Sequence, residues 1–552
     1  MSSIAQPDAG RPRAEAQPLA HSKVWRAGVT ALVGVIALAL RWPYLMLVPR
    51  LTDETAEIKW AWRIAQGEIL PLTHVDPYYG IVHPYLLAGL FTALGPHTIL
   101  PRALNAVAGA LLAALVAWVA WGMAGRTEDQ GPRTEDRNPN WSLVLRPSSA
   151  LGGSSSTAAS LVAGLLTAAS FPLIVVNSHI AWSNGLTPLF VTGALAATWF
   201  AVMDRRGWWL VGAGFLWGLA LQTHPSVVTL LPGVVAWVIW QPTGRGWLRT
   251  RWPWLAVGAF LLGYANLIVA NLIGGGQSVD AALNPQNAYS LPGSVAEYLG
   301  RVGEMALQLA RMLAGSYTIQ TDGGLPLTVT PWVAVYGALA VAALVWAARR
   351  RDTALLPLLV GSAWLLLPLV SHSFTALHDT RYIAFLLPPV YLALGLAAGA
   401  LWARWATAGR LALAVTTTML IAVPLVSLAQ FYRDSAAYGL TNAAILQVAE
   451  AAHVAAAEQG AIVLLDREMR PIKLGGGGDP VRAMEFLMTT EGTPNQTARP
   501  DTINWYLHNA EAPLFLVLAD ATATNLGASA TLTPTGLRGD GFAAYTARPA
   551  KR

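Results

Sequence analysis

Long apolar runs recur along most of this chain, and they constrain its fold more than any other feature. A membrane-spanning helix needs roughly 20 consecutive, mostly apolar residues. About eleven runs approach or reach that length, so the sequence predicts a polytopic α-helical membrane protein. The predicted spans are residues 27–48, 102–124, 158–176, 185–203, 208–222, 225–240, 252–273, 330–348, 354–371, 382–402 and 410–430.

The composition agrees with this class of protein. Of the 552 residues, 54% are hydrophobic and only 12% are charged, whereas a soluble protein carries roughly 25% charged residues. The chain has no cysteine, which excludes disulfides, thiolate metal sites and cysteine nucleophiles. The net charge of +6 does not indicate a nucleic-acid partner, because the basic residues lie in short loops between apolar runs.

The charges in the connecting loops predict the orientation of the chain in the plasma membrane. Lys and Arg are enriched in cytoplasmic loops. If the short apolar segment 80–95 does not cross, every short basic loop falls on the side of the basic N-terminus. The N-terminus is then cytoplasmic, and with an odd number of spans everything after about Phe431 is extracytoplasmic. The short basic loops are Asp204-Arg205-Arg206, residues 241–251, Arg349-Arg350-Arg351 and Arg404 to Arg410.

The segments outside the predicted spans differ from the spans, and from one another, in residue composition. Residues 1–23 are polar and lack periodicity, which predicts a disordered cytoplasmic tail. Residues 125–157, rich in Ser and Gly, are expected to form a flexible cytoplasmic insertion. The outer loop 49–101 is expected to hold re-entrant or interfacial helices, and a second long outer loop covers residues 274–329.

Residues 432–552 are predicted to form a small extracytoplasmic α/β domain, separate from the membrane domain at 24–431. Short apolar runs at Ala461–Leu465 and Leu514–Leu518 alternate with helical patterns, which is typical of such domains. The glycines Gly475–Gly478 lack the Lys-Ser/Thr of a phosphate loop, so we interpret them as a turn.

Polar residues of catalytic types gather in the predicted outer loops. For any one of them alone, simple solvation at the end of a span is the plainer interpretation. Asp53 is the exception, because it follows an apolar span directly, lies beside Glu54, and precedes a segment that returns into the membrane. A carboxylate held at the mouth of a cavity in this way can act as a general base. The other polar residues of these loops include Glu57, His74, His83, His179, Asn184, His224, His372, His378, Asp379 and Arg381.

The order of these features resembles a known family. A long span, an Asp-Glu pair, an amphipathic helix, and His83-Pro84 leading an apolar segment are followed by Gly95 to Arg102 at the next span. Arg381-Tyr382 with Pro388 then opens a late span. This pattern is similar to polyprenyl-phosphate-sugar-dependent glycosyltransferases of the GT-C fold, such as the protein mannosyltransferases and the aminoarabinose transferase of lipid A. The resemblance covers roughly residues 27–430.

The resemblance implies a role for each matching residue. Asp53 would be the catalytic base that takes the acceptor's proton, and Glu54 would support it or bind the acceptor. His83 and Arg381 would face the donor phosphate, with His378 as a helper. The substrate-binding candidates are Asn184, His224, Tyr382 and Asp379.

The implied reaction moves a sugar from a polyprenyl phosphate to a protein, lipid or glycan acceptor, with inversion at the anomeric carbon. Cleavage of the sugar–phosphate bond builds negative charge on the phosphate, which fixed cations in a water-poor site stabilise. One base and one cationic clamp suffice, whereas glycosidases use paired carboxylates. A donor that partitions into membrane lipids also accounts for the lack of a nucleotide-sugar motif.

One position departs from the family pattern. Many relatives carry an aspartate where this chain has Asn184, so the resemblance does not supply a second acidic residue, or a metal held by two carboxylates, at this position. The outer acids and histidines remain candidates for Mg²⁺ or Mn²⁺, although no ligand spacing requires it. No cofactor is otherwise expected.

Two other classes of protein compete with this hypothesis. A transporter or flippase would show paired halves and polar residues near mid-span, whereas here the polar residues lie at the outer ends of the spans. A non-catalytic assembly protein, acting through residues 432–552, would have a decayed active site, and Asn184 favours that alternative mildly.

Overall fold

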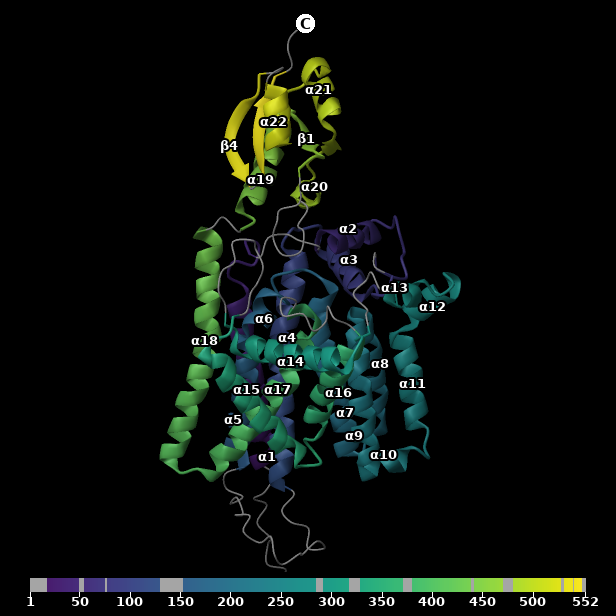
Figure 1. Ribbon diagram of the computed structural model, residues 1–552, viewed down its shortest axis with the longest axis vertical. Coiled ribbons are helices and arrows are strands. Elements are labelled where there is room, and N and C mark those ends of the chain that lie inside the picture. The colour runs from purple at the N-terminus through teal and green to yellow at the C-terminus, as the bar shows by residue number, and fades with distance from the viewer. Residues whose placement is uncertain are drawn as a thin grey trace, which may run out of the picture.

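The computed structural model consists of a helical bundle with a small α/β domain at one end (Figure 1). The structure describes residues 17–48, 54–74, 77–129, 152–283, 291–316, 328–370, 380–437, 441–469, 480–527, 531–539 and 541–548. Helix α1 begins at Gln17, so residues 17–23 of the predicted disordered tail are helical.

Each predicted span coincides with a helix or with a pair of consecutive helices. Among the described helices, six are long and apolar enough to cross a membrane, and the total is seven when the pair α11–α12, bent by 64°, is counted as one span. The total of eleven spans stays a prediction. The helices are α1 (Gln17–Arg41), α4 (Leu100–Asp129), α5 (Gly152–Ala169) with α6 (Phe171–Val175), α7 (Thr187–Asp204), α8 (Gly207–Thr223), η4 (Pro225–Leu230) with α9 (Leu231–Trp240), α11 (Trp252–Gly263) with α12 (Ala265–Ile273), α15 (Pro331–Ala348), α16 (Leu355–Val370), α17 (Leu387–Arg404) and α18 (Thr407–Ala437).

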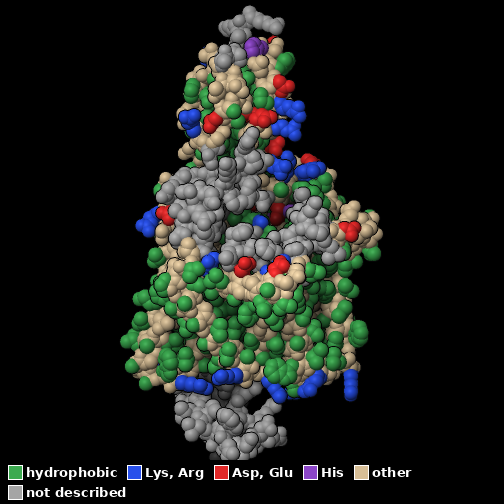
Figure 2. Space-filling view, viewed as in Figure 1, with side chains coloured by type: hydrophobic (Ala, Val, Ile, Leu, Met, Phe, Trp, Pro, Cys, Tyr) green, Lys and Arg blue, Asp and Glu red, His purple; other side chains and the backbone are tan. Residues whose placement is uncertain are grey.

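The surface of the bundle matches a membrane environment. Its sides are mostly hydrophobic, and Lys and Arg side chains form a row at the end away from the C-terminal domain (Figure 2). Short helix α10 (Pro242–Trp247) lies at that end (Figure 1). Charged groups therefore mark the two ends of the bundle and leave its sides apolar.

Helices α2 (Glu54–Ala65) and α3 (Val82–Leu94) lie at the opposite end, beside the C-terminal domain (Figure 1). The 13 residues of α3 extend only about 20 Å at 1.5 Å per residue, which is less than the hydrocarbon core of a bilayer. This length agrees with the prediction that segment 80–95 does not cross.

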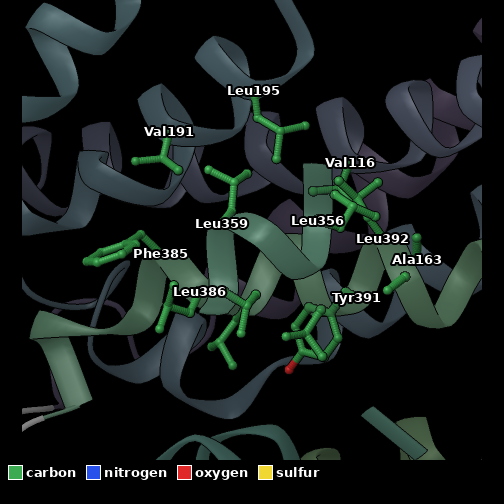
Figure 3. Packing of buried hydrophobic residues seen from close by; sticks show 14 of the residues in the cluster. Val116, Ala163, Val191, Leu195, Leu356, Leu359, Phe385, Leu386, Tyr391 and Leu392 are labelled. Atoms are coloured by element: carbon green, nitrogen blue, oxygen red, sulfur yellow. The ribbon is translucent and has the colours of Figure 1, made fainter. Parts of the chain in front are cut away.

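Small residues allow α5 and α17 to pack backbone to backbone. A Cβ added at Gly395 would lie 2.6 Å from the carbonyl oxygen of Ala159, and one at Gly399 would lie 2.7 Å from that of Ser155. Such close approach is the usual mode of helix association in membranes. Around this contact the bundle core is filled by buried apolar side chains from α4, α5, α7, α16, η7 (Ala384–Leu386) and α17 (Figure 3).

The predicted outer loop 274–329 contains two helices, α13 (Gln277–Leu283) and α14 (Val295–Ala314). Helix α14 begins with a side-chain cap, because Ser294 Oγ accepts the backbone N–H of Glu297 at 3.1 Å. Its charged residues interrupt the apolar pattern too often for a span, which is why the sequence pattern indicated only a loop. It packs across α15 and α16 (Figure 1).

The C-terminal domain is an α/β domain, as the sequence predicted. A five-stranded sheet has the order β2-β1-β3-β5-β4, in which β1 pairs in parallel with β2 and β3. The two predicted apolar strands are β1 and β3. The elements are α19 (Ala443–Gln459), β1 (Ile462–Asp466), α20 (Pro480–Thr490), β2 (Asn495–Ala498), α21 (Pro500–Asn509), β3 (Leu514–Ala519), α22 (Asp520–Gly527), β4 (Thr533–Gly539) and β5 (Phe542–Ala547).

Within the described residues, the C-terminal domain contacts the rest of the protein at two places. Buried residues of α2 and α3 form one hydrophobic cluster with residues of α19 and α20, and Lys59 pairs with Glu485 at 3.2 Å across this contact. Asn442 donates from its backbone to Leu47 O at 2.8 Å and from its side chain to Met46 O at 2.9 Å. Helix α2 therefore lies between the C-terminal domain and the bundle.

Candidate functional site

Two acidic side chains of α2 point into the protein on one face of the helix. Glu54 and Glu57 are three residues apart, a spacing that places side chains next to each other on a helix. Both are buried, with 0% and 8% of their surface exposed. Buried carboxylates require partners, and each of these two has a different set.

Glu54 is held by an arginine of α4. Arg102 donates from Nη2 to Oε1 at 2.5 Å and from Nε to Oε2 at 3.2 Å. The backbone N–H of Ala181 donates to Oε2 at 2.6 Å. These bonds engage both carboxylate oxygens, so Glu54 anchors the start of α2 directly after the predicted base Asp53, which lies outside the described residues.

Loss of this pair should destabilise the protein strongly. We expect Arg102→Ala to lower the free energy of unfolding by about 3–5 kcal/mol, because it leaves the Glu54 carboxylate buried without its cation. The measurement is unfolding of the detergent-solubilised protein by tryptophan fluorescence.

Arg126→Ala is the matched control on the same helix. Arg126 pairs with Asp204, and both side chains are partly exposed. We therefore expect the free energy of unfolding to fall by about 1 kcal/mol or less. Equal losses in the two variants would contradict an anchoring role for the Glu54–Arg102 pair.

Glu57 joins three segments that are far apart in the sequence. Its Oε2 accepts Nδ1–H of His83 at 2.8 Å and the Ser183 hydroxyl at 2.7 Å, and the backbone N–H of Ser183 donates to the same oxygen at 2.9 Å. His74 Nε2 lies 3.6 Å from Oε1. Burial would raise the pKa of Glu57, but the two histidines and Ser183 outweigh it and lower the pKa to about 2. Glu57 is therefore a carboxylate at neutral pH.

A row of aromatic rings connects this cluster to the segment around Arg381. The ring centroids of His74 and Tyr79 are 6.0 Å apart, those of Tyr79 and His224 are 5.5 Å apart, and those of His224 and Tyr382 are 5.0 Å apart. His224 caps η4, because its Nδ1 accepts the backbone N–H of Ser226 at 3.2 Å. Burial, and then the charge of Arg381, lower the pKa of His224 to about 3, so this ring is neutral.

Arg381 belongs to the short helix η6 (Thr380–Tyr382). Its guanidinium lies against two aromatic rings, one of them from outside this helix. Its Cζ is 4.7 Å from the ring centroid of Trp182 and 4.8 Å from that of Tyr382. Stacking of this kind restrains a guanidinium plane while leaving its N–H groups able to donate. Trp182 directly precedes Ser183, so Arg381 and His83 are linked through Glu57 and η3 (Ser183–Leu186).

The turn that contains Asn184 is fixed from both sides. Asn105 of α4 donates to Ile180 O at 2.7 Å and to Trp182 O at 3.1 Å. Asn177 donates to the backbone oxygen of Asn184 at 3.1 Å. Asn184 itself is buried, which places an amide next to the Glu57 partner Ser183.

The structure thus places six of the predicted site residues at the end of the bundle near the C-terminal domain. They are Glu54, His83, Asn184, His224, Arg381 and Tyr382. Three others, Asp53, His378 and Asp379, lie outside the described residues. The sequence analysis did not assign roles to Arg102, Glu57, His74 and Ser183. Of these four, Glu57 could have been identified from the sequence, because its three-residue spacing from Glu54 places both acids on one face of the helix.

Among the described residues, no group of three His, Asp or Glu side chains has the arrangement of a metal site. The carboxylates of Glu54 and Glu57 are instead paired with protein groups, and the guanidinium of Arg381 stacks on aromatic rings. The expectation of Mg²⁺ or Mn²⁺ stays a prediction.

The comparisons with known proteins agree with this architecture. Residues 152–269 match the model of the dolichyl-phosphate-mannose-protein mannosyltransferase family. The structure is similar to ArnT from Cupriavidus metallidurans bound to undecaprenyl phosphate, with a TM-score of 0.54 and 15% identity, covering 96% of this chain and 98% of that chain. The apo form of the same protein gives a TM-score of 0.53 and 14% identity, covering 95% and 98%. Among curated proteins, no sequence matches this chain. The chain therefore has an ArnT-like fold, in agreement with the GT-C fold that the sequence motifs predicted.

Proposed function

We propose that this protein is a membrane glycosyltransferase that moves a sugar from a polyprenyl-phosphate donor to an acceptor on the side of its C-terminal domain. Asp53 is the base that takes the acceptor's proton. His83 and Arg381, with His378, bind the donor phosphate. Asn184, His224, Tyr382 and Asp379 are assigned to substrate binding.

The observation that carries this proposal is the match in fold over nearly the whole chain. The two chains correspond along 96% and 98% of their lengths, so the resemblance includes the C-terminal domain as well as the bundle. The similar structure is described as bound to undecaprenyl phosphate, which supports a lipid phosphate as the donor's carrier here.

The chemistry of the site supports the same assignment. Inverting transfer requires a base at the acceptor and positive charge at the departing phosphate. Arg381 provides such charge, and the two buried carboxylates of α2, Glu54 and Glu57, are occupied by protein partners. The departing phosphate is a stable anion, so no acid is needed to protonate it.

The distribution of charge supports extracytoplasmic transfer. The row of Lys and Arg lies at the end of the bundle away from the site (Figure 2), and basic residues accumulate at the cytoplasmic ends of spans. The site and the C-terminal domain would then face outward.

The decisive experiment incubates the purified protein with a panel of radiolabelled polyprenyl-phosphate sugars and measures release of polyprenyl phosphate. Release with at least one donor, dependent on an acceptor, is the expected result. Binding of polyprenyl phosphate without release from any donor would favour a flippase instead.

The orientation can be tested separately, because the chain has no cysteine of its own. Single cysteines are placed at two exposed positions, Asn509 in α21 and Gly246 in α10. In intact cells, a membrane-impermeant maleimide should label Asn509→Cys and should label Gly246→Cys only after lysis. The reverse pattern would overturn the predicted orientation.

A further inference from the structure

Glu57 is the most connected buried charge of the site, although the proposed reaction assigns it no step. Its carboxylate receives hydrogen bonds from α3 and η3, and its own helix packs against the C-terminal domain. A carboxylate can only accept hydrogen bonds. The proton between Glu57 and His83 therefore resides on Nδ1 of the imidazole, and this bond fixes the orientation of the ring.

The second ring nitrogen of His83, Nε2, indicates what this side chain can bind. His83 is fully buried, and its Nε2 makes no hydrogen bond to any described residue. Nε2 of a buried imidazole normally has a partner. Within the described residues, the ring is therefore held through Nδ1, and Nε2 remains available for a further hydrogen bond.

The same carboxylate also fixes the residue beside the second cation. Ser183 donates both its backbone N–H and its hydroxyl to Glu57, and the preceding residue Trp182 stacks on Arg381. Movement of Glu57 would therefore disturb His83 directly and Arg381 through Trp182.

We propose that Glu57 is a positioning residue that holds the His83 imidazole and the Trp182–Arg381 stack at the spacing required to clamp the donor phosphate. The inference rests on the proposed function, because it assumes that a lipid phosphate is the ligand. It adds that, with Nδ1 bonded to Glu57, Nε2 is the ring atom of His83 that forms a hydrogen bond with the donor phosphate.

The test measures binding of undecaprenyl phosphate to the full-length protein in nanodiscs, followed by donor KM and kcat. Glu57→Gln keeps the size of the side chain and removes its charge. We expect a roughly 10-fold weaker Kd and a similar rise in donor KM with little change in kcat, the loss typical of a charge-assisted hydrogen bond. Glu57→Asp should recover part of the affinity and provides a second variant if Glu57→Gln is poorly folded.

A double-mutant cycle separates positioning from general stability. In a His83→Ala background, Glu57→Gln should weaken binding much less than it does in the wild type. The matched control is Glu485→Gln, which breaks the partly exposed pair with Lys59 on the outer side of the same helix and should leave Kd unchanged.

The outcomes are distinguishable. If the wild type binds undecaprenyl phosphate and Glu57→Gln and Glu57→Asp bind it equally well, the role of Glu57 is overturned while the proposed function stands. Additive losses in the cycle would also overturn it. If the wild type neither binds undecaprenyl phosphate nor releases it from any donor, the proposed function falls, and the role of Glu57 falls with it.

Discussion

Asp53→Asn should abolish sugar transfer while leaving the protein folded and able to bind the donor. The substitution keeps the size of the side chain and removes only its ability to accept a proton. General-base catalysis contributes roughly 10²- to 10⁴-fold to rate, so we expect kcat to fall by about that factor. The measurement is release of polyprenyl phosphate from the best donor in the panel, with Kd for undecaprenyl phosphate measured in parallel.

Asp501→Asn is the control, because Asp501 is an exposed acid in α21 of the C-terminal domain. It should have wild-type activity. Near-wild-type turnover in Asp53→Asn would rule out Asp53 as the base. A loss of undecaprenyl-phosphate affinity as large as the loss of turnover would instead place Asp53 at the donor.

Arg381→Ala should impair use of the donor far more than use of the acceptor. The guanidinium carries a full charge and is stacked between Trp182 and Tyr382, so its removal takes away both the charge and the packing of the site. Loss of one preorganised charge-stabilising group costs roughly 10²- to 10³-fold in rate. We expect a decrease of that size in kcat/KM for the donor, measured by steady-state kinetics with each substrate varied in turn.

Arg381→Lys distinguishes charge from geometry. A lysine keeps the positive charge but lacks the planar stack and the forked donors, so an intermediate activity is expected. The exposed Arg467 in the C-terminal domain provides the control variant Arg467→Ala, which should not alter donor kinetics. Equal losses toward donor and acceptor in Arg381→Ala would contradict a phosphate-binding role.

The membrane domain could be predicted in detail because apolar run length is a local signal. The predicted runs fall on α1, α4 to α9, α11, α12 and α15 to α18. Strands β1 and β3 were visible as short apolar runs, the first of which ends at Asp466. Strand β2, with the sequence NQTA, is polar and short, and it is a strand only because β1 pairs with it. The amphipathic helix α14 was missed because it is too polar to resemble a span.

The site could be predicted only as a set of residue types on one side of the membrane. Motif order selected Glu54, His83 and Arg381, but no pattern could supply the partners of Glu57. His83 is 26 residues away from Glu57 in the sequence and Ser183 is 126 residues away. Contacts over such separations depend on how the helices pack. The residues next to Glu57 in the sequence therefore could not show that its carboxylate bonds both His83 and Ser183.

The shared core of α2, α3, α19 and α20 has a consequence for how such proteins diversify. Because Ile58 and Ala61 of α2 belong to the same hydrophobic cluster as Met484 and Leu487 of α20, the C-terminal domain is not an interchangeable module. A recombination event that exchanged residues 441–548 alone would bring a foreign surface onto the helix that carries Glu54 and Glu57. Inheritance of a new C-terminal domain would thus require matching changes in α2, and the two are expected to vary together among related chains.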